Sequence, residues 1–317
     1  MVEPLPRASQ WSEKGPAGEN FDHAIREIEV ATIQTDPFAH ILIDALFPDD
    51  FFAELLTNFP PRDSLTRVTY PGTGYGRVHG ERFDYGLSCL DFSDIPTFAD
   101  LERFFQSDRF ARVLLEKFSK PGDDGTAPIP QSKNQYFVDG ASDFKSVCNL
   151  HIDLPGYEIP PHRDVSTKVV TFQHYLVSDD SLRDYGTIFC KPRNGHETAK
   201  RSRLAKQVGR CVKTAAKLTA TTNSAAFHRL AETQFALWSG MAVAHWLPWS
   251  LFDDVIVTPA LPNHFMAFAP GRRTYHGVRF DPPAGAVTLE RRVMRGFILA
   301  GSDAQNWVQE AHKGQYR

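Results

Sequence analysis

The spacing of apolar and polar positions divides the chain into a helical N-terminal part and a strand-rich C-terminal part. Apolar residues recur at helical spacing over 21–33, over 51–59 and, in a phenylalanine-rich stretch, over 97–119. Asp49 and Asp50 supply the acidic first turn typical of a helix start, and Pro60-Pro61 ends that helix. The β-branched run at 37–44 predicts a strand, and residues 1–20, with their Pro and Gly residues, predict a flexible arm.

From Gln135 onward the pattern changes to short apolar runs separated by Pro, Gly and Asp. These runs predict strands at 147–154, 168–177, 185–192, 254–259, 264–268 and 292–300. Many short strands with such punctuation are typical of a sandwich, barrel or jelly roll. A stretch of helical character interrupts them, and we place this insertion at about 195–245. We therefore expect an α+β, mainly β protein: one domain over 21–317, with helical support at 21–130 and a strand-rich core at 135–300.

Residues 62–95 contain several Gly, Tyr and Arg residues and show little periodicity. Polar and aromatic loop residues often line binding sites, so this segment is a candidate pocket wall. A surface loop without a special role explains the composition equally well. Both interpretations stay open at the level of sequence.

Composition excludes several classes of protein. The 317 residues are 42% hydrophobic and 23% charged, as in an ordinary globular protein, and a net charge of −3 gives no general attraction for nucleic acid or an anionic membrane. No apolar run is long enough to span a membrane, and the first residues lack the apolar segment of a secretory signal. The four cysteines are far apart and form no C-x-x-C pair, which argues against a zinc finger. We expect a cytoplasmic protein with reduced thiols.

A candidate metal site lies at His162-Arg163-Asp164, with a further histidine, His276, downstream. Two histidines and one carboxylate are the ligand set of a mononuclear non-haem Fe(II) site. A bare His-x-Asp triplet is not specific, because His151-Ile152-Asp153 matches it too. Alternate residues of a strand lie on the same side, so either triplet can direct both side chains to one metal. We choose the later triplet because it follows a Pro-Gly turn at the mouth of a sheet, where a metal keeps open positions for oxygen.

Several segments of the chain occur in the order and spacing found in a known family. They are Pro37-Phe38-Ala39-His40 leading through a helix to Phe59-Pro60, Gly156 six residues before His162, Phe172-Gln173-His174-Tyr175-Leu176, Tyr185-Gly186-Thr187-Ile188-Phe189 and His276-Gly277-Val278. Through them the sequence resembles the Fe(II)/2-oxoglutarate-dependent oxygenases of double-stranded β-helix fold, especially the prolyl-4-hydroxylase-like group. The resemblance covers residues 37–300 apart from the insertion, and it implies a jelly-roll core.

The resemblance also assigns ligands. It implies that His162, Asp164 and His276 bind iron and that an arginine shortly after His276 pairs with the far carboxylate of 2-oxoglutarate. Arginine suits this task because its planar fork meets a carboxylate in two parallel hydrogen bonds. We predict Arg292 for this role, with Arg291 as the alternative, because Arg292 shares a strand face with Gly296, which would leave room for a ligand.

Strand parity indicates further pocket residues. Thr171, Gln173 and Tyr175 would share one polar face and are candidates for contacts with 2-oxoglutarate, Tyr175 foremost. Asn149, His151 and Asp153 would share a face one strand away. His151 is then either a residue of the cofactor pocket or an ordinary buried histidine, and both interpretations stay open.

The activity that the resemblance implies is a dioxygenase reaction with Fe(II), 2-oxoglutarate and O2, in which succinate and CO2 are released. Members of the family that are halogenases carry a small residue where this chain has Asp164, so hydroxylation is the expected outcome. We expect a small-molecule substrate such as an amino acid or a secondary-metabolite intermediate. The alternatives are a hydroxylase of a protein- or carrier-bound residue and, from a different class, a metal-binding jelly-roll protein without catalysis.

The insertion is strongly basic at its start. Within residues 191–217 there is one acidic residue, Glu197, and there are nine basic ones: Lys191, Arg193, Lys200, Arg201, Arg203, Lys206, Arg210, Lys213 and Lys217. This stretch is either a solvated helix face or a docking surface for an anionic small molecule or a carrier protein. RNA is the least favoured partner, because no aromatic residues alternate with the basic ones and no nucleic-acid-binding motif occurs. No feature of the sequence predicts an oligomeric state.

Overall fold

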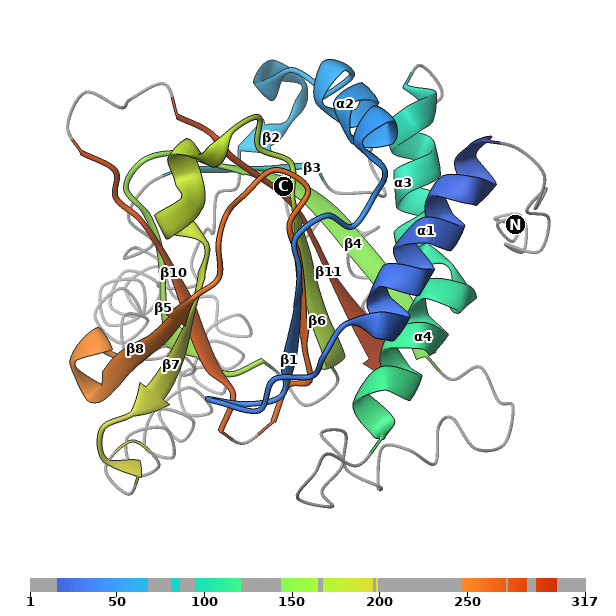
Figure 1. The fold of residues 1–317 in the computed structure, drawn as a ribbon. Helices are drawn as coiled ribbons and strands as arrows, with labels where there is room; N and C mark the ends of the chain where they lie inside the picture. Colours follow the sequence, from blue (N-terminus) through green and yellow to red (C-terminus); the bar gives the residue numbers. More distant parts are fainter. Residues whose placement is uncertain are drawn as a thin grey trace, which may run out of the picture.

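The computed structural model describes residues 16–67, 81–85, 95–120, 144–164, 168–195, 198, 247–271, 273–283 and 289–300. Two antiparallel sheets face each other, and helices cover the outer side of the larger one (Figure 1). The larger sheet has the order β1 (His40–Ile43), β9 (Phe265–Phe268), β6 (Lys168–Tyr175), β11 (Arg291–Ala300), β4 (Phe144–Asp153), β3 (Arg82–Tyr85) and β2 (Thr66–Arg67). The smaller sheet has the order β5 (Tyr157–His162), β10 (Tyr275–Phe280), β7 (Thr187–Pro192) and β8 (Phe252–Val257).

The strand order is that of a jelly roll. Along the chain β4, β5 and β6 alternate between the sheets, as do β9, β10 and β11, so that β11 lies between β4 and β6 and β10 lies beside β5. The central pair β4 and β11 is aligned over ten residues, from Arg291 opposite Asp153 to Ala300 opposite Phe144. The predicted fold class, a mainly β jelly roll supported by N-terminal helices, is confirmed.

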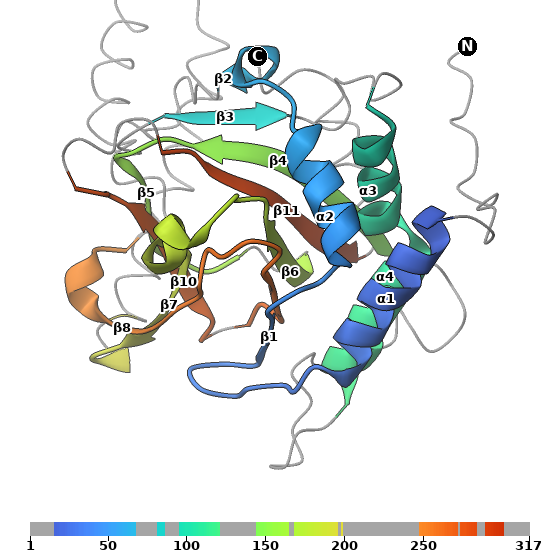
Figure 2. The ribbon, with the colours of Figure 1, turned by 45° about the horizontal axis from the view of Figure 1, so that its top comes forward.

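The helices bury their apolar stripes against the outer face of the larger sheet. They are α1 (Pro16–Val30), α2 (Asp49–Thr57), α3 (Pro96–Gln106) and α4 (Asp108–Ser119), with 3-10 turns at Arg62–Ser64, Asp180–Tyr185 and Trp249–Leu251. Figure 2 shows α1 and α4 side by side, with α3 above β4. Phe105 of α3 and Phe110 of α4 pack on Phe172 of β6. Burial of each such ring contributes about 1.5–3 kcal/mol to the stability of the fold. The layer between the helices and the larger sheet contains the main hydrophobic core.

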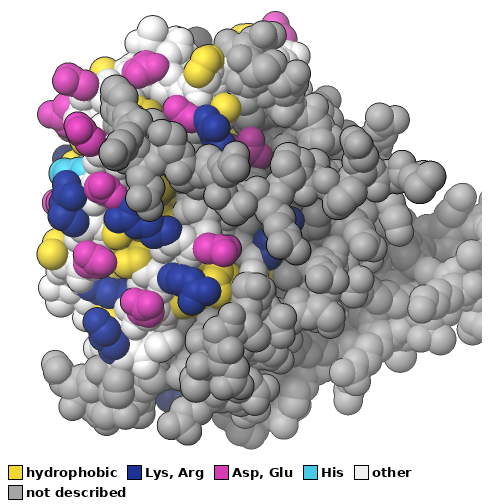
Figure 3. Space-filling view, turned by 90° about the vertical axis from the view of Figure 1, so that its right-hand side faces the viewer, with side chains coloured by type: hydrophobic (Ala, Val, Ile, Leu, Met, Phe, Trp, Pro, Cys, Tyr) yellow, Lys and Arg dark blue, Asp and Glu magenta, His cyan; other side chains and the backbone are white. Residues whose placement is uncertain are grey.

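On the described part of the helical face, charges of both signs are mixed. Figure 3 shows basic and acidic side chains interspersed over its described part. Ion pairs such as Arg109–Asp22 and Arg103–Asp100 account for some of this mixture. No helix of the described residues combines the length and apolar character that crossing a membrane requires.

The structure corrects three details of the sequence prediction. The first helix begins at Pro16, so the end of the predicted arm is helical, and residues 1–15 lie outside the described part. The segment 62–95 contains β2 and β3, which extend the larger sheet, and is therefore more than a loop. A strand absent from the prediction, β5, follows the Gly156 turn. The predicted insertion lies outside the described residues, apart from Gly195 and Thr198.

Candidate metal centre

His162 and His276 are brought together by the pairing of β5 with β10. In this antiparallel pair the two histidines are direct partners, and their ring centroids are 4.3 Å apart. Gly156 has a φ of 87°, which a residue without a Cβ adopts readily, and its turn reverses the chain from β4 into β5. The backbone N–H of Gly156 donates to the carbonyl of Phe280 on β10, which holds the start of β5 to its partner. A glycine-dependent turn and one strand pairing therefore create the histidine pair.

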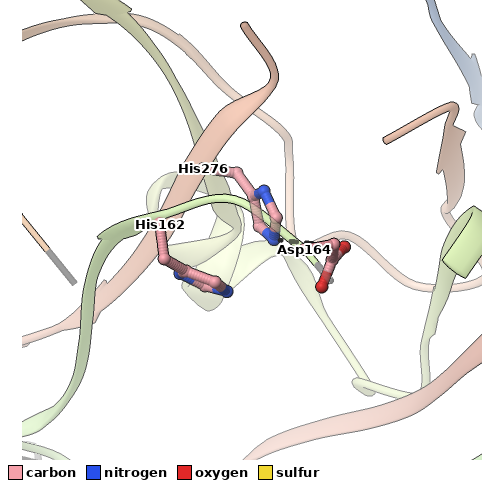
Figure 4. A group of neighbouring side chains, drawn as sticks. All are labelled: His162, Asp164 and His276. Atoms are coloured by element: carbon pink, nitrogen blue, oxygen red, sulfur yellow. Dashed lines mark ion pairs between the residues drawn. The ribbon is translucent and has the colours of Figure 1, made fainter. Parts of the chain in front are cut away.

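Asp164 completes a three-residue cluster. It lies two residues beyond the end of β5, and Figure 4 shows its carboxylate directed toward the two imidazole rings. One ligand atom from each of the three residues lies within 4.8 Å of the others, and a dashed line marks the His276 Nε2 to Asp164 Oδ2 distance of 3.7 Å. His276 is 6% exposed, while His162 and Asp164 are half-buried as whole residues. The cluster therefore lies largely inside the protein, and His162 and Asp164 keep part of their surface exposed.

The protonation states of the cluster suit metal binding at neutral pH. Burial, followed by the neighbouring His276, lowers the pKa of His162 to about 3, and burial is also the main cause of the lowered pKa of His276. Burial acts to raise the pKa of Asp164, but Lys168, His276 and His162 together bring it below its usual range. His162 Nδ1 lies 3.0 Å from the carbonyl of Pro160 and donates to it, which leaves the lone pair on Nε2. The cluster therefore offers two neutral imidazoles and one ionised carboxylate.

Two donors orient the carboxylate of Asp164. Lys168 Nζ donates to Oδ1 and Thr171 Oγ1 donates to Oδ2, each at 2.6 Å. Both donors come from β6, so the larger sheet positions a ligand that follows the smaller sheet. Such partners of a ligating carboxylate fix its orientation. Two histidines and one carboxylate fit Fe(II) as found in non-haem oxygenases, and the residues present fit the metal that the sequence pattern predicts.

The side of β11 that faces the metal site carries Arg291, which corrects the predicted choice of Arg292. Arg291 is 1% exposed, and its guanidinium donates to Asp153 Oδ2 at 2.5 Å. It also lies 3.4 Å from the Tyr175 hydroxyl and 3.5 Å from Gln173 Oε1. Since Thr171, on the same face of β6, reaches Asp164, this is the inner face of the sheet.

Arg292 lies on the opposite, outer side. Its guanidinium pairs with Glu290 at 2.8 Å and stacks over the Phe59 ring at 4.3 Å. The predicted face of β11 was wrong because Gly296 was expected to leave room for a ligand. A Cβ at Gly296 would instead meet the Phe172 ring and the carbonyl of Val147, so this glycine accommodates the packing of the helix-facing core.

The predicted polar face of β6 lies inside the sandwich. Tyr175 is fully buried, and its hydroxyl accepts from the backbone N–H of Thr187 at 3.0 Å and lies 3.2 Å from Thr258 Oγ1. Gln173 Oε1 accepts from Thr187 Oγ1 at 2.8 Å. These contacts fix the two β6 side chains beside Arg291. The third residue of that face, Thr171, serves the metal cluster instead.

The earlier triplet does not join the metal cluster. His151 is fully buried on the inner face of β4, and burial followed by the charges of Arg295, Arg82 and Arg291 lowers its pKa well below 6.5. Asp153 accepts from Arg82 through both oxygens, at 2.6 and 3.0 Å, and from Arg291 as well. Burial acts to raise the pKa of Asp153, but the two guanidiniums lower it. A buried Arg82–Asp153–Arg291 triad therefore occupies this end of the sheet.

Sequence reasoning missed several residues of this region. Lys168 was recognised only as a strand start, although its position four residues after Asp164 was a usable signal. Arg82 was counted within a loop, because β3 has no distinct apolar alternation. Arg295, on the inner face two residues before Phe297, had no motif to mark it.

Comparison with known proteins gives structural similarity without sequence similarity. Neither a protein-family model nor a curated protein matches the sequence. A prolyl-4-hydroxylase from Pseudomonas putida is 12% identical with a TM-score of 0.40, over 88% of this chain and 98% of that one. HygX from Streptomyces hygroscopicus, whose structure contains nickel and 2-oxoglutarate, is 12% identical with a TM-score of 0.39, over 83% of each chain. An oxidoreductase of the 2OG-Fe(II) oxygenase family from Burkholderia pseudomallei is 11% identical with a TM-score of 0.39, over 92% and 95%. The fold assignment itself rests on the strand order and pairing described above.

Proposed function

We propose that the protein is an Fe(II)- and 2-oxoglutarate-dependent dioxygenase that hydroxylates a small molecule. The observation that carries the proposal is the cluster of His162, Asp164 and His276, because two neutral imidazoles and a carboxylate are the donor set of this class of iron site. When bound, iron and 2-oxoglutarate supply the activation of O2, with release of succinate and CO2.

The residues of this chain would divide the remaining tasks. His162, Asp164 and His276 would hold the metal, and Lys168 and Thr171 would keep the Asp164 carboxylate in place. Arg291 would receive the far carboxylate of 2-oxoglutarate, with Tyr175 beside it as a second donor. The closely packed Tyr175, Gln173 and Thr187 would exclude water from that end of the site.

A small-molecule substrate is a proposal that the sequence favours only mildly. An amino acid or a secondary-metabolite intermediate is the preferred substrate, and the carboxylate of Asp164 leaves no ligand position for a halide. A protein- or carrier-bound substrate is the alternative, and it would use the basic insertion that lies outside the described residues. A metal-binding protein without catalysis is the remaining alternative, and the pairing of Arg291 with Asp153 favours it, because that pairing gives the arginine a structural role too.

One spectroscopic experiment tests the proposal. Fe(II) and 2-oxoglutarate added together without oxygen should give the weak visible charge-transfer band of a chelated keto acid. His162→Ala should abolish the band, while His23→Ala, on the partly exposed side of α1, should leave it unchanged. Absence of the band from the intact protein would exclude the oxygenase function, and its survival in His162→Ala would exclude this ligand set.

A further inference from the structure

The polar residues on the inner face of the larger sheet differ in how far they reach solvent. Arg291 and Tyr175, next to the start of β11, are buried, at 1% and 0% exposed. Arg295, four residues further along β11, its neighbour Asn149 and Lys168 are partly exposed, although Gln173 opposite Arg295 is buried. A molecule that arrives from solvent can meet only accessible side chains. Of these cations, Arg295 and Lys168 are therefore the ones that a substrate arriving from solvent would meet.

Strand register places Arg295 close to the metal cluster. Arg295 lies opposite Gln173 of β6 and opposite Asn149 of β4, and Phe297, two residues further, lies opposite Thr171. Thr171 donates to the Asp164 carboxylate. Arg295 and Thr171 are therefore diagonal neighbours on one sheet face, and such neighbours are about 7–8 Å apart.

Arg295 and Lys168 form one cationic cluster on the ring of Phe297. Lys168 Nζ lies 3.4 Å from the ring centroid, and Cζ of Arg295 lies 5.3 Å from it. Two like charges on one ring repel each other unless an anion lies between them.

The two cations differ in their anionic partners. Lys168 pairs with Asp164, but that carboxylate is also a ligand of the proposed metal. Arg295 has no ion pair within the part of the chain that the structure describes, and its buried Nε has no hydrogen-bond partner. A partly exposed arginine that has no ion pair among the described residues is suited to bind an anion beside the metal cluster.

A carboxylate of 2-oxoglutarate does not account for Arg295. Arg291 and Arg295 lie on the same face four residues apart, which separates their Cα atoms by about 13 Å. Arg291, at the buried end beside Tyr175, is the group suited to the far carboxylate of that co-substrate. The guanidinium of Arg295 is left for a second anion.

We propose that Arg295, with Lys168 beside it, binds a carboxylate of the substrate, so that the substrate class is a small organic acid. This inference rests on the proposed function. The guanidinium would hold the carboxylate in two parallel hydrogen bonds, and the rest of the molecule would extend toward the metal cluster. The C–H bond to be oxidised would then lie a few bonds away from the carboxylate.

The test compares free acids with their uncharged analogues. Benzoate, hexanoate and N-acetyl-L-phenylalanine, each with its primary amide, are titrated into the protein loaded with Fe(II) and 2-oxoglutarate without oxygen. Calorimetry and the change in the visible band both report binding. At least one acid should bind about ten- to a hundredfold more tightly than its amide, as expected when a charge-assisted hydrogen bond is lost.

Matched variants locate the preference. Arg295→Gln should remove the preference for the acid, and Arg295→Lys, which keeps the charge, should retain part of it. Arg292→Gln is the control, because it changes the same residue type on the outer face of the same strand and should keep the full preference. All three variants should give the 2-oxoglutarate band at the concentration that the unaltered protein requires.

Each contrary result has a distinct meaning. Equal binding of acids and amides, no binding of any acid, or a preference that survives Arg295→Gln would overturn the inference while leaving the oxygenase function intact. A weaker 2-oxoglutarate band in Arg295→Gln would assign this arginine to the co-substrate and would also overturn it. Absence of the band from the unaltered protein would remove the proposed function and this inference together.

Discussion

This chain has two His-x-Asp triplets, one before and one after the turn at Gly156, and the fold gives them different chemistry. His162 and Asp164 lie at and beyond the end of β5, where they meet His276. His151 and Asp153 lie within β4, where Asp153 is held between Arg82 and Arg291. The side chains of both aspartates are buried, at 4% and 0% exposed, and the pKa of each is lowered. Burial therefore does not distinguish the triplets.

The partners of the two carboxylates make the difference. A guanidinium stays protonated and has no lone pair to offer a metal, so Asp153 is committed to an ion pair. The imidazoles beside Asp164 are neutral and can share a metal with it. The same short motif thus predicts a ligand pair only where the tertiary structure surrounds it with other ligands.

The largest expected effect distinguishes the aspartates by metal binding. Asp164→Ala should abolish the band with Fe(II) and 2-oxoglutarate and reduce succinate formation to background, because one of three ligands is lost. Circular dichroism should stay unchanged, since the residue lies beyond a strand end. A retained band would show that the metal is bound by other residues.

The next effect concerns stability. Asp153→Ala should lower the free energy of unfolding of the metal-free protein by about 3–5 kcal/mol, because it leaves Arg82 and Arg291 buried without their carboxylate. Urea denaturation measures the loss. Asp180→Ala removes an exposed ion pair with Arg183 and should change stability by less than about 1 kcal/mol. If the two variants lost equally little, the triad would have no structural role.

A third prediction compares the arginines on the two faces of β11. Arg291→Lys should weaken 2-oxoglutarate binding by about 1.5 kcal/mol, roughly tenfold, because lysine keeps the charge but loses the planar fork. Arg292→Lys, on the outer face, should leave the affinity unchanged. Titration of the visible band gives both values. The reverse order would restore Arg292 as the anchor.

The smallest effect is a pH dependence from the structural triplet. The folded-state pKa of His151 is well below 6.5, so the unfolded chain binds a proton there first and stability falls as pH decreases below 6.5. At pH 5.5 this residue should cost the metal-free protein about 1 kcal/mol relative to pH 7.5. His151→Gln should flatten that part of the stability profile, whereas His23→Gln should not. Identical slopes for all three proteins would mean that His151 takes up its proton in the folded state.

Local signals in the sequence were sufficient for most elements. The Phe-rich stripe of 97–119 became α3 and α4, and the predicted strands correspond to β4, β6, β7, β8, β9 and β11. These elements were predictable because side-chain period and punctuation act over a few residues. The short strands β2 and β3 were not, because they are stabilised by pairing with β4 rather than by a pattern of their own.

The sequence was not sufficient to choose between Arg291 and Arg292. Strand parity correctly separated the two residues onto opposite faces, but it does not state which face is inside. That was decided by the helices, which cover the face of Met294 and Ile298 and leave that of Arg291 toward the smaller sheet. The sequence by itself determined the main helices and strands and singled out His162, Asp164 and His276 as candidate ligands. The tertiary structure alone decided which arginine is enclosed, that Asp153 is paired, and that Arg295 stays partly exposed, because each depends on contacts between residues distant in the chain.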